Sequence, residues 1–556
     1  MAAYPKALNK MHNNMQFTFL SALIVFLTCA LQSFVIHAEI IEGLLDEQKP
    51  TGMKNGLIKI SRIRLEGDAI YPEYGITNKF INTRINQLFS HLDDRLDMAE
   101  IDKLADAITL TYREKGLTFN RAFVVPQEIK NATLTIHVLK GILSEIDVYD
   151  SVLYSNKQIK EPFDKLIGKV IYEPDVMRVV DNINKRPGLK IFAYFSTGSK
   201  QGESRLNIKV RNETRSENTL SFDNKGISDT GHNRIIYSHT ENNLFSLAGQ
   251  LNVSVLKTNK EDNVFGGIYY QRPISENKNM GLSLVKSDFS ITGQFSNLGL
   301  EGALTSASGI IANENKGKGN ISLKKTHHLV LSYKESKVTS KAFPEIFNET
   351  TRYAMFNTHH KHHYMTNVNS QHIFSITPSL GLIDTSDARS ISENFFSVGA
   401  SYRYLLFNPI RITNRNNVLS LKLSGKWSDD ELPAPEKYST TGPTVNRGYK
   451  PGVFSGNTGY RVSTEHSINW NIDKESWMKD VKIQTSLFID YSYGMINIKK
   501  RHEASFSSAG ISISSTFRNQ ISLGASIAKP LDHSITGDVD IDSDAPVIYA
   551  NASVTF

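Results

Sequence analysis

The chain of 556 residues contains one cysteine, Cys29, which lies in the single apolar run long enough to be considered as a membrane-spanning helix, residues 17–35. Lysines precede this run and polar sequence follows it, so residues 1–38 are predicted to be a secretory signal; an uncleaved anchor is the alternative. Cleavage after Ala38 would remove Cys29, which would exclude disulfides and thiolate metal sites from the mature chain. Export without disulfides suits the envelope of a Gram-negative bacterium.

The sequence also lacks the short motifs that carry enzymatic chemistry. It contains no G-x-S-x-G elbow, no H-E-x-x-H and no P-loop. The net charge of +7 is modest for this length, and Lys and Arg are interspersed with Asp and Glu. We therefore expect no enzyme, no catalytic residue, no metal, no cofactor and no nucleic-acid partner.

Helical periodicity is absent from about Ser216 to the end of the chain. Short runs of alternating apolar and polar residues recur there, separated by clusters of Gly, Asn, Asp, Ser and Lys. Roughly 340 residues, at about 20 residues for each strand and its connection, allow on the order of sixteen strands. Residues 216–556 are predicted to form a transmembrane antiparallel β-barrel, and a soluble sandwich is the alternative.

The last eleven residues, 546–556, form the clearest of these strands. Ile548, Ala550, Ala552, Val554 and Phe556 would line one face, with polar residues and Tyr549 largely on the other. A strand that ends on an aromatic residue looks like the closing strand of an outer-membrane barrel. Phe556 is therefore a candidate signal for assembly into that membrane.

Residues 57–215 show a different pattern, in which helices and strands alternate. Ile81 and Ile85 fall at helical spacing behind Thr77, a plausible N-cap, and a second apolar stripe runs from Ile101 to Tyr112. Strands are expected over 119–125 and around 134–138. The order β-α-α-β-β predicts one module over 57–140 and a weaker repeat over 141–215, with 39–56 as a short N-terminal linker.

Motifs in these segments resemble the TpsB family, the outer-membrane transporters of two-partner secretion, whose periplasmic modules are called POTRA. Tyr112-Arg-Glu-Lys-Gly116, followed by residues 121–127, is similar to the end of the long helix and the next strand of the first POTRA module. Lys140 replaces the acid that usually precedes Gly141, and Ala132 stands where the family commonly has glycine. The 184–188 and 222–226 segments resemble the second module and the first barrel strand.

The sharpest resemblance is Val445-Asn-Arg-Gly-Tyr449, which is similar to the family's "V-R-G-F/Y" loop tip, with Asn446 in the slot normally filled by valine. A second segment, residues 486–492, resembles the strand motif "G-x-F-x-D-x-G". It keeps Phe488 and Asp490 but has serine at both glycine positions. The resemblance implies that Asn446, Arg447, Gly448 and Tyr449 fold back into the barrel and that Arg447 pairs with Asp490 on the wall.

Physical chemistry supports this pair independently. A guanidinium enclosed in a lumen needs a bidentate anionic partner, and removal of one partner from a dry pair costs roughly 3–5 kcal/mol. Phe488 and Asp490 share one strand face, so both point inward or neither does. Gly448 would let the backbone turn where the tip meets the wall.

Two further clusters carry weaker signals. His359, His360, His362 and His363 surround Lys361, and these side chains could bind a transition metal. On a strand, His360 and His362 would share one face, but a solvated surface loop is the preferred interpretation. Asp429, Asp430 and Glu431 are expected to be a surface charge run.

The resemblance implies export of a large partner protein, such as a haemolysin, adhesin or contact-dependent toxin, whose N-terminal secretion domain the POTRA modules would capture. Outer-membrane lipid and the barrel assembly machinery are further expected partners. An insertase that assembles other barrels is the alternative, although about 160 residues before the barrel suit only two modules. A passive porin or surface adhesin would need neither the modules nor an inward loop. The linker 39–56 has room for only a short helix, so a pore-plugging helix is not expected.

Overall fold

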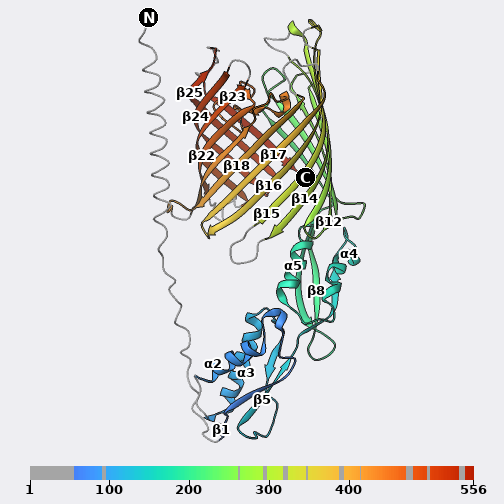
Figure 1. The fold of residues 1–556 in the computed structure, drawn as a ribbon, viewed down its shortest axis with the longest axis vertical. Helices are drawn as coiled ribbons and strands as arrows, with labels where there is room; N and C mark the ends of the chain where they lie inside the picture. The colour runs from blue at the N-terminus through green and yellow to red at the C-terminus, as the bar shows by residue number, and fades with distance from the viewer. Residues whose placement is uncertain are drawn as a thin grey trace.

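The computed structural model describes residues 56–90, 95–260, 263–291, 297–316, 324–345, 348–386, 393–412, 415–470, 480–497, 501–537 and 545–556. The predicted signal at 1–38, and the linker 39–56 except for Gly56, lie outside these ranges. None of the helices in the described ranges is long and apolar enough to cross a membrane. Two small modules hang below a tall barrel (Figure 1).

The first module packs two helices against a three-stranded sheet. Its elements are β1 (Ile58–Lys59), β2 (Arg62–Gly67), η1 (Pro72–Tyr74), α2 (Asn78–Phe89), β3 (Arg95–Leu96), α3 (Met98–Glu114), β4 (Arg121–Phe123) and β5 (Thr133–Leu139). The sheet order is β2-β5-β4. Thr77 caps α2 by accepting a hydrogen bond from the Phe80 amide at 3.2 Å, as its sequence position suggests. The strand expected over 119–125 is shorter, because backbone pairing with β5 covers only Arg121–Phe123.

The long helix α3 supplies most of the core of this module. It begins with a capping box in which Asp97 and Glu100 each accept the other's backbone amide. Tyr112 near its end is fully buried and donates to the Ala69 carbonyl at 2.8 Å. Burial raises the pKa of the Tyr112 hydroxyl, so the proton needed for this bond stays in place. Gly116 then takes a left-handed conformation, φ +86°, that ends the helical segment.

The second module repeats this plan with β6 (Ile142–Tyr149), α4 (Asn156–Lys160), η2 (Glu161–Leu166), α5 (Glu173–Ile183), β7 (Leu189–Thr197) and β8 (Glu203–Glu213), in sheet order β6-β8-β7. The two modules meet through stacked rings of Tyr74 and Tyr172, whose centroids are 4.3 Å apart. Lys140, which replaces the family's acid at the junction, forms an ion pair with Asp68 at 2.7 Å.

Sixteen antiparallel strands close the barrel, as the residue count predicts, with the last strand paired to the first. They are β9 (Ser216–Asp223), β10 (Arg234–Leu244), β11 (Gly249–Thr258), β12 (Val264–Ser275), β13 (Lys278–Ser290), β14 (Leu300–Lys316), β15 (Lys324–Ser340), β16 (Asn348–Asn367), β17 (Ser370–Ser386), β18 (Asn394–Phe407), β19 (Asn416–Trp427), β22 (Thr458–Trp470), β23 (Val481–Asn497), β24 (Arg501–Phe517), β25 (Ile521–Ile535) and β26 (Val547–Thr555).

Alternation along the strands separates an apolar outer face from a polar lumen. On β23, Leu487 and Ile489 are 63% and 60% exposed, whereas Phe488 and Asp490 are 3% and 1% exposed. The outward residues face the position of lipid, and the inward ones face other protein groups. On β26, Ile548 is exposed and Tyr549 is buried, so the predicted two faces of the last strand are confirmed. Phe556 exchanges two 2.9 Å backbone hydrogen bonds with Asn218.

The loop interpretation of the histidine cluster is wrong. His359 to His363 lie within strand β16, where His360 and His362 point to the same side as His327 of β15, and the Nδ1 atoms of His327 and His360 are 2.8 Å apart. This end of the strand is polar on both faces, so apolar alternation does not mark it. Among the described residues, no group of three or more His, Cys, Asp or Glu side chains is arranged to hold a metal ion.

Candidate functional site

The connection between β19 and β22, residues 428–457, carries the predicted loop motif. It contains a short helix, η4 (Ala434–Glu436), and two short paired strands, β20 (Tyr438–Ser439) and β21 (Ser455–Gly456). Its tip is buried although it is largely polar: Asn446 and Tyr449 have almost no exposed surface. A surface loop would leave such groups in solvent, so the tip is packed against the inner wall.

Arg447 binds both carboxylate oxygens of Asp490 through two of its guanidinium nitrogens. The Nε atom lies 2.7 Å from Oδ2 and an Nη atom lies 2.9 Å from Oδ1. The backbone amide of Arg447 also donates to Oδ2 at 3.2 Å, and the Ser463 hydroxyl donates to Oδ1 at 2.7 Å. The guanidinium carbon lies 3.3 Å from the centre of the Phe488 ring, a cation–π contact. The structure thus brings together the three residues that the sequence singled out on loop and wall.

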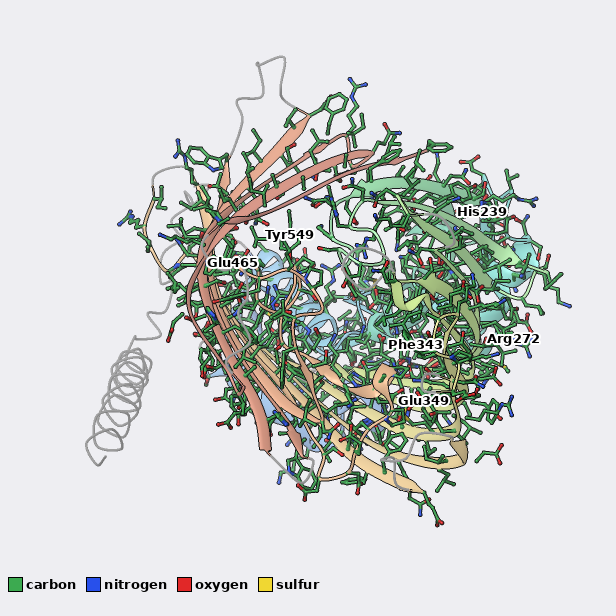
Figure 2. The ribbon with its side chains drawn as sticks, turned by 90° about the horizontal axis from the view of Figure 1, so that it is seen from above. His239, Arg272, Phe343, Glu349, Glu465 and Tyr549 are labelled. Carbon is green, nitrogen blue, oxygen red and sulfur yellow. The ribbon has the colours of Figure 1, made fainter. Side chains whose placement is uncertain are left out.

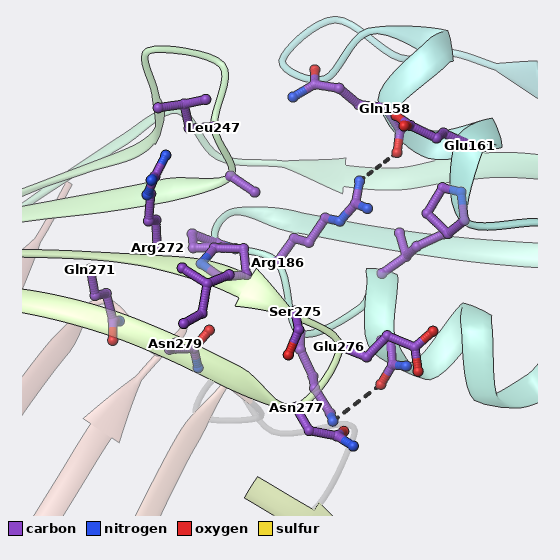
Figure 3. A pocket seen from close by; sticks show the side chains of 18 of the residues that line it. Gln158, Glu161, Arg186, Leu247, Gln271, Arg272, Ser275, Glu276, Asn277 and Asn279 are labelled. Carbon is purple, nitrogen blue, oxygen red and sulfur yellow. Dashed lines mark hydrogen bonds between the residues drawn. The ribbon is translucent and has the colours of Figure 1, made fainter. Parts of the chain in front are cut away.

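Glu465 is a further member of this site that the sequence did not reveal. Its carboxylate accepts the second Arg447 Nη at 3.0 Å. Glu465 lies on β22 directly opposite Phe488, two residues beyond Ser463, so strand register brings it to the same inward face. Figure 2 shows Glu465 and Tyr549 on the inner side of the wall formed by the C-terminal strands. A motif search misses Glu465 because the pairing of β22 with β23 is needed to find it.

Two of the departures from the family pattern, Asn446 and Ser492, face each other. Asn446, in the usual valine position, donates to the Ser492 hydroxyl at 3.3 Å, and Ser492 stands at a usual glycine position. The same amide donates to the Phe506 carbonyl at 2.9 Å, and its oxygen accepts the Ser508 hydroxyl at 2.7 Å. The polar loop residue is therefore matched by a polar wall, as burial of an amide requires.

Gly448 and Tyr449 fit the tip against strands β24 to β26. A Cβ atom at Gly448 would lie 2.3 Å from the Ser508 Cβ, so no other residue fits without displacement. The Tyr449 hydroxyl donates to the Asp532 carbonyl at 2.9 Å, and its own carbonyl accepts the Tyr549 hydroxyl at 2.8 Å. Glycine is required here because the backbone approaches Ser508 closely, and not because it adopts a left-handed conformation.

The acidic residues at the start of the loop are only in part a surface run. Asp429 is exposed, but Asp430 accepts the Phe396 amide at 2.7 Å. Glu431 is nearly buried, forms an ion pair with Lys437 and accepts from Asn457 at 2.7 Å. These contacts fix the conformation of the loop where it leaves β19.

The fold and this site define a class: outer-membrane β-barrel transporters with periplasmic POTRA modules. A family model described as "POTRA domain, ShlB-type" matches residues 58–141. A second, "Haemolysin secretion/activation protein ShlB/FhaC/HecB", matches residues 202–290 and 348–517. The chain belongs to the TpsB family of outer-membrane transporters of two-partner secretion.

Characterised relatives agree with this assignment. The heme/hemopexin transporter protein HuxB of Haemophilus influenzae is 21% identical over 463 residues, covering 81% of this chain and 80% of the relative. The outer membrane transporter CdiB of Escherichia coli is 23% identical over 455 residues, covering 78% and 73%. The solved structure of CdiB from E. coli superposes with a TM-score of 0.66 at 17% identity, covering 92% and 93% of the two chains.

The protein is therefore an outer-membrane translocator that exports a partner exoprotein, with its POTRA modules in the periplasm. A solved BamA barrel from Haemophilus ducreyi is also similar in fold, with a TM-score of 0.54 at 15% identity. That likeness concerns the fold alone.

Proposed function

We propose that the Arg447 loop closes the export channel and that export requires it to leave its place on the wall. The observation that carries this proposal is the bidentate contact of Arg447 with Asp490, whose side chain is almost completely buried. A loop fixed by a charge pair, a cation–π contact and a buried amide holds one position within the lumen. Such a contact has two discrete states, made and broken, which suits a gate.

The POTRA modules capture the unfolded N-terminal secretion domain of the partner. Strand β7 supports this step because it pairs only with β8 among the described strands and leaves its other edge open. Phe192 and Tyr194 on this strand are exposed and stacked, with ring centroids 6.0 Å apart. An extended segment that pairs with this edge would gain backbone hydrogen bonds and aromatic contacts without needing a fixed sequence.

The remaining partners follow from the outer surface of the barrel. The exposed apolar side chains of alternate strand positions contact outer-membrane lipid. Phe556 is 66% exposed beside the closing seam, where the barrel assembly machinery would recognise it. Secreted haemolysins, adhesins and contact-dependent toxins are the class of cargo. The residues proposed to hold the channel closed are Asn446, Arg447, Gly448 and Tyr449 on the loop, and Phe488 and Asp490 on the wall.

Replacement of Arg447 by alanine tests the closing role. Arg447→Ala should raise the resting conductance of the channel in a planar lipid bilayer, because the loop loses its anchor on the wall, while the barrel stays inserted. Lys450→Ala is the matched control, since Lys450 is an exposed cation three residues away in the same loop. Conductance is measured in single-channel recordings, and barrel insertion as heat-modifiable migration in a gel. An unchanged resting conductance of an inserted Arg447→Ala protein would refute the proposal.

A further inference from the structure

The loop makes a second charged contact with the wall, eleven residues before Arg447 in the chain. Glu436, at the end of η4, accepts hydrogen bonds from Lys334 Nζ at 2.6 Å and from the Tyr353 hydroxyl at 2.9 Å. Lys426 Nζ lies 3.9 Å from the other carboxylate oxygen and donates to the Glu436 backbone carbonyl. The Glu436 side chain is only 9% exposed. One loop carboxylate thus occupies a pocket of cationic and hydroxyl donors that come from three wall strands.

These donors are parts of the barrel wall and not of the loop. Lys334 lies on β15, Tyr353 on β16 and Lys426 on β19, and all three face inward with the alternation of their strands. When the loop leaves, the two lysines remain in the lumen without the carboxylate that now neutralises them. Buried or half-buried ammonium groups without an anion are costly, so another anion is favoured there.

More cations continue from this pocket along the same wall. Arg403 on β18, Lys422 on β19 and Arg461 on β22 all face the lumen, and Arg403 pairs in register with Lys422. No carboxylate of the described residues lies within ion-pair distance of Arg403 or Arg461, whose Nε atoms donate to serine hydroxyls at 3.4 Å and 2.8 Å. Lys422 lies 3.9 Å from Glu465, but that carboxylate also binds Arg447. The wall therefore carries an excess of positive charge.

We propose that Lys334, Tyr353 and Lys426 form a carboxylate-binding site of the open channel. Glu436 fills the site in the resting protein, and an acidic segment of the exported polypeptide fills it once the loop has withdrawn. Arg403, Lys422 and Arg461 extend the same surface for further acidic side chains. The proposal rests on the proposed closing role of the loop, and it adds the chemistry that the lumen recognises.

This arrangement makes the loop an internal competitor of the cargo. The site holds one carboxylate, with two donors on one oxygen and the Lys426 ammonium near the other, so Glu436 and a transiting Asp or Glu cannot occupy it together. Release of Glu436 lowers the free energy of binding an acidic segment at this site, and binding of an acidic segment lowers the free energy needed to release the loop. The two events are coupled because they share one set of donors.

The test measures the block of single-channel current by a short peptide. Full-length protein carrying Glu436→Gln and Arg447→Gln, which breaks both charged contacts of the loop, is inserted into a planar lipid bilayer, and hexaglutamate or hexalysine is added to both sides. Hexaglutamate should reduce the current at lower concentration than hexalysine. Adding Lys334→Gln and Lys426→Gln to this variant should raise the half-blocking concentration of hexaglutamate about tenfold or more, because two charged donors are lost.

Lys337→Gln in the same Glu436→Gln, Arg447→Gln background is the matched control, since Lys337 lies on the same strand as Lys334 but at an outward, exposed position. It should leave the half-blocking concentration unchanged. Equal block of the Lys334/Lys426 variant and this control, or stronger block by hexalysine, would overturn the proposal. Its failure is distinct from failure of the gate: an unchanged resting conductance of Arg447→Ala, measured without peptide, refutes the gate, whatever the peptides do.

Discussion

The pair of Arg447 and Asp490 permits a quantitative prediction about channel closure. Asp490→Asn keeps the shape of the side chain but removes the charge that faces the guanidinium. In a dry site this loss would cost about 3–5 kcal/mol. Arg447 is 15% exposed and keeps Glu465 as a partner, so the cost to the closed state should be smaller, about 2–3 kcal/mol.

This cost should appear in the equilibrium between the closed and open channel. A change of about 2–3 kcal/mol corresponds to a roughly 30- to 150-fold increase in the ratio of open to closed channels. Single-channel recording of the purified protein in a planar bilayer gives this ratio directly. The Arg447→Gln variant should shift the ratio in the same direction, because it removes the other member of the pair.

A double-mutant cycle separates the pair from the rest of the site. If Arg447 and Asp490 act on closure through each other, the double variant should be less open than the sum of the single effects predicts, by a coupling free energy of about 1.5–3 kcal/mol. Coupling below about 0.5 kcal/mol, the range of independent sites, would refute the reasoning. An unchanged open ratio in Asp490→Asn would refute it as well.

Three further predictions concern two residues of the loop tip and one residue of the first POTRA module. Gly448→Ala should displace the loop tip, since the new Cβ would meet Ser508 at 2.3 Å, and raise the resting conductance in the same bilayer assay; an unchanged conductance would contradict the fit. Asn446→Val should destabilise closure by about 1–3 kcal/mol through unpaired buried groups, and adding Ser492→Gly should recover part of this loss in the open ratio. Ala132→Gly should stabilise the first POTRA module by about 0.5–1 kcal/mol, because Ala132 has a left-handed φ of +51° that glycine adopts without strain. Amide hydrogen exchange in this module should then be slower, and faster exchange would contradict the prediction.

The fold was predictable because periodicity reports directly on burial. Alternation of period two marks strands with one lipid face, and the number of such strands follows from the length of the region. Helices α2 and α3 were predictable from apolar stripes and from the capping positions Thr77 and Gly116. Strand ends were less predictable: the end of β16 at His359 to His363 is polar on both faces, so its pattern resembles that of a loop.

The site was predictable only where it coincides with a motif. Arg447 and Asp490 lie in segments that resemble known patterns, and period two then orients Phe488 with Asp490. No sequence motif identifies Glu465 or Glu436. Their roles depend on strand register and on the path of the loop across the lumen, which are long-range properties that no local spacing encodes.

The position of the loop depends on three separate sectors of the wall. Arg447 and Asn446 bind β22 to β24, the Tyr449 carbonyl binds Tyr549 of β26, and Glu436 binds β15, β16 and β19. In the described contacts the Arg447 and Glu436 networks share no side-chain partner, so their variants should act additively on closure. Loss of one contact then loosens the loop without releasing it, and full opening requires both charged contacts to break. A cargo that supplies carboxylates to the Glu436 pocket would remove one of these two barriers, which gives the exported chain a direct physical means to open its own channel.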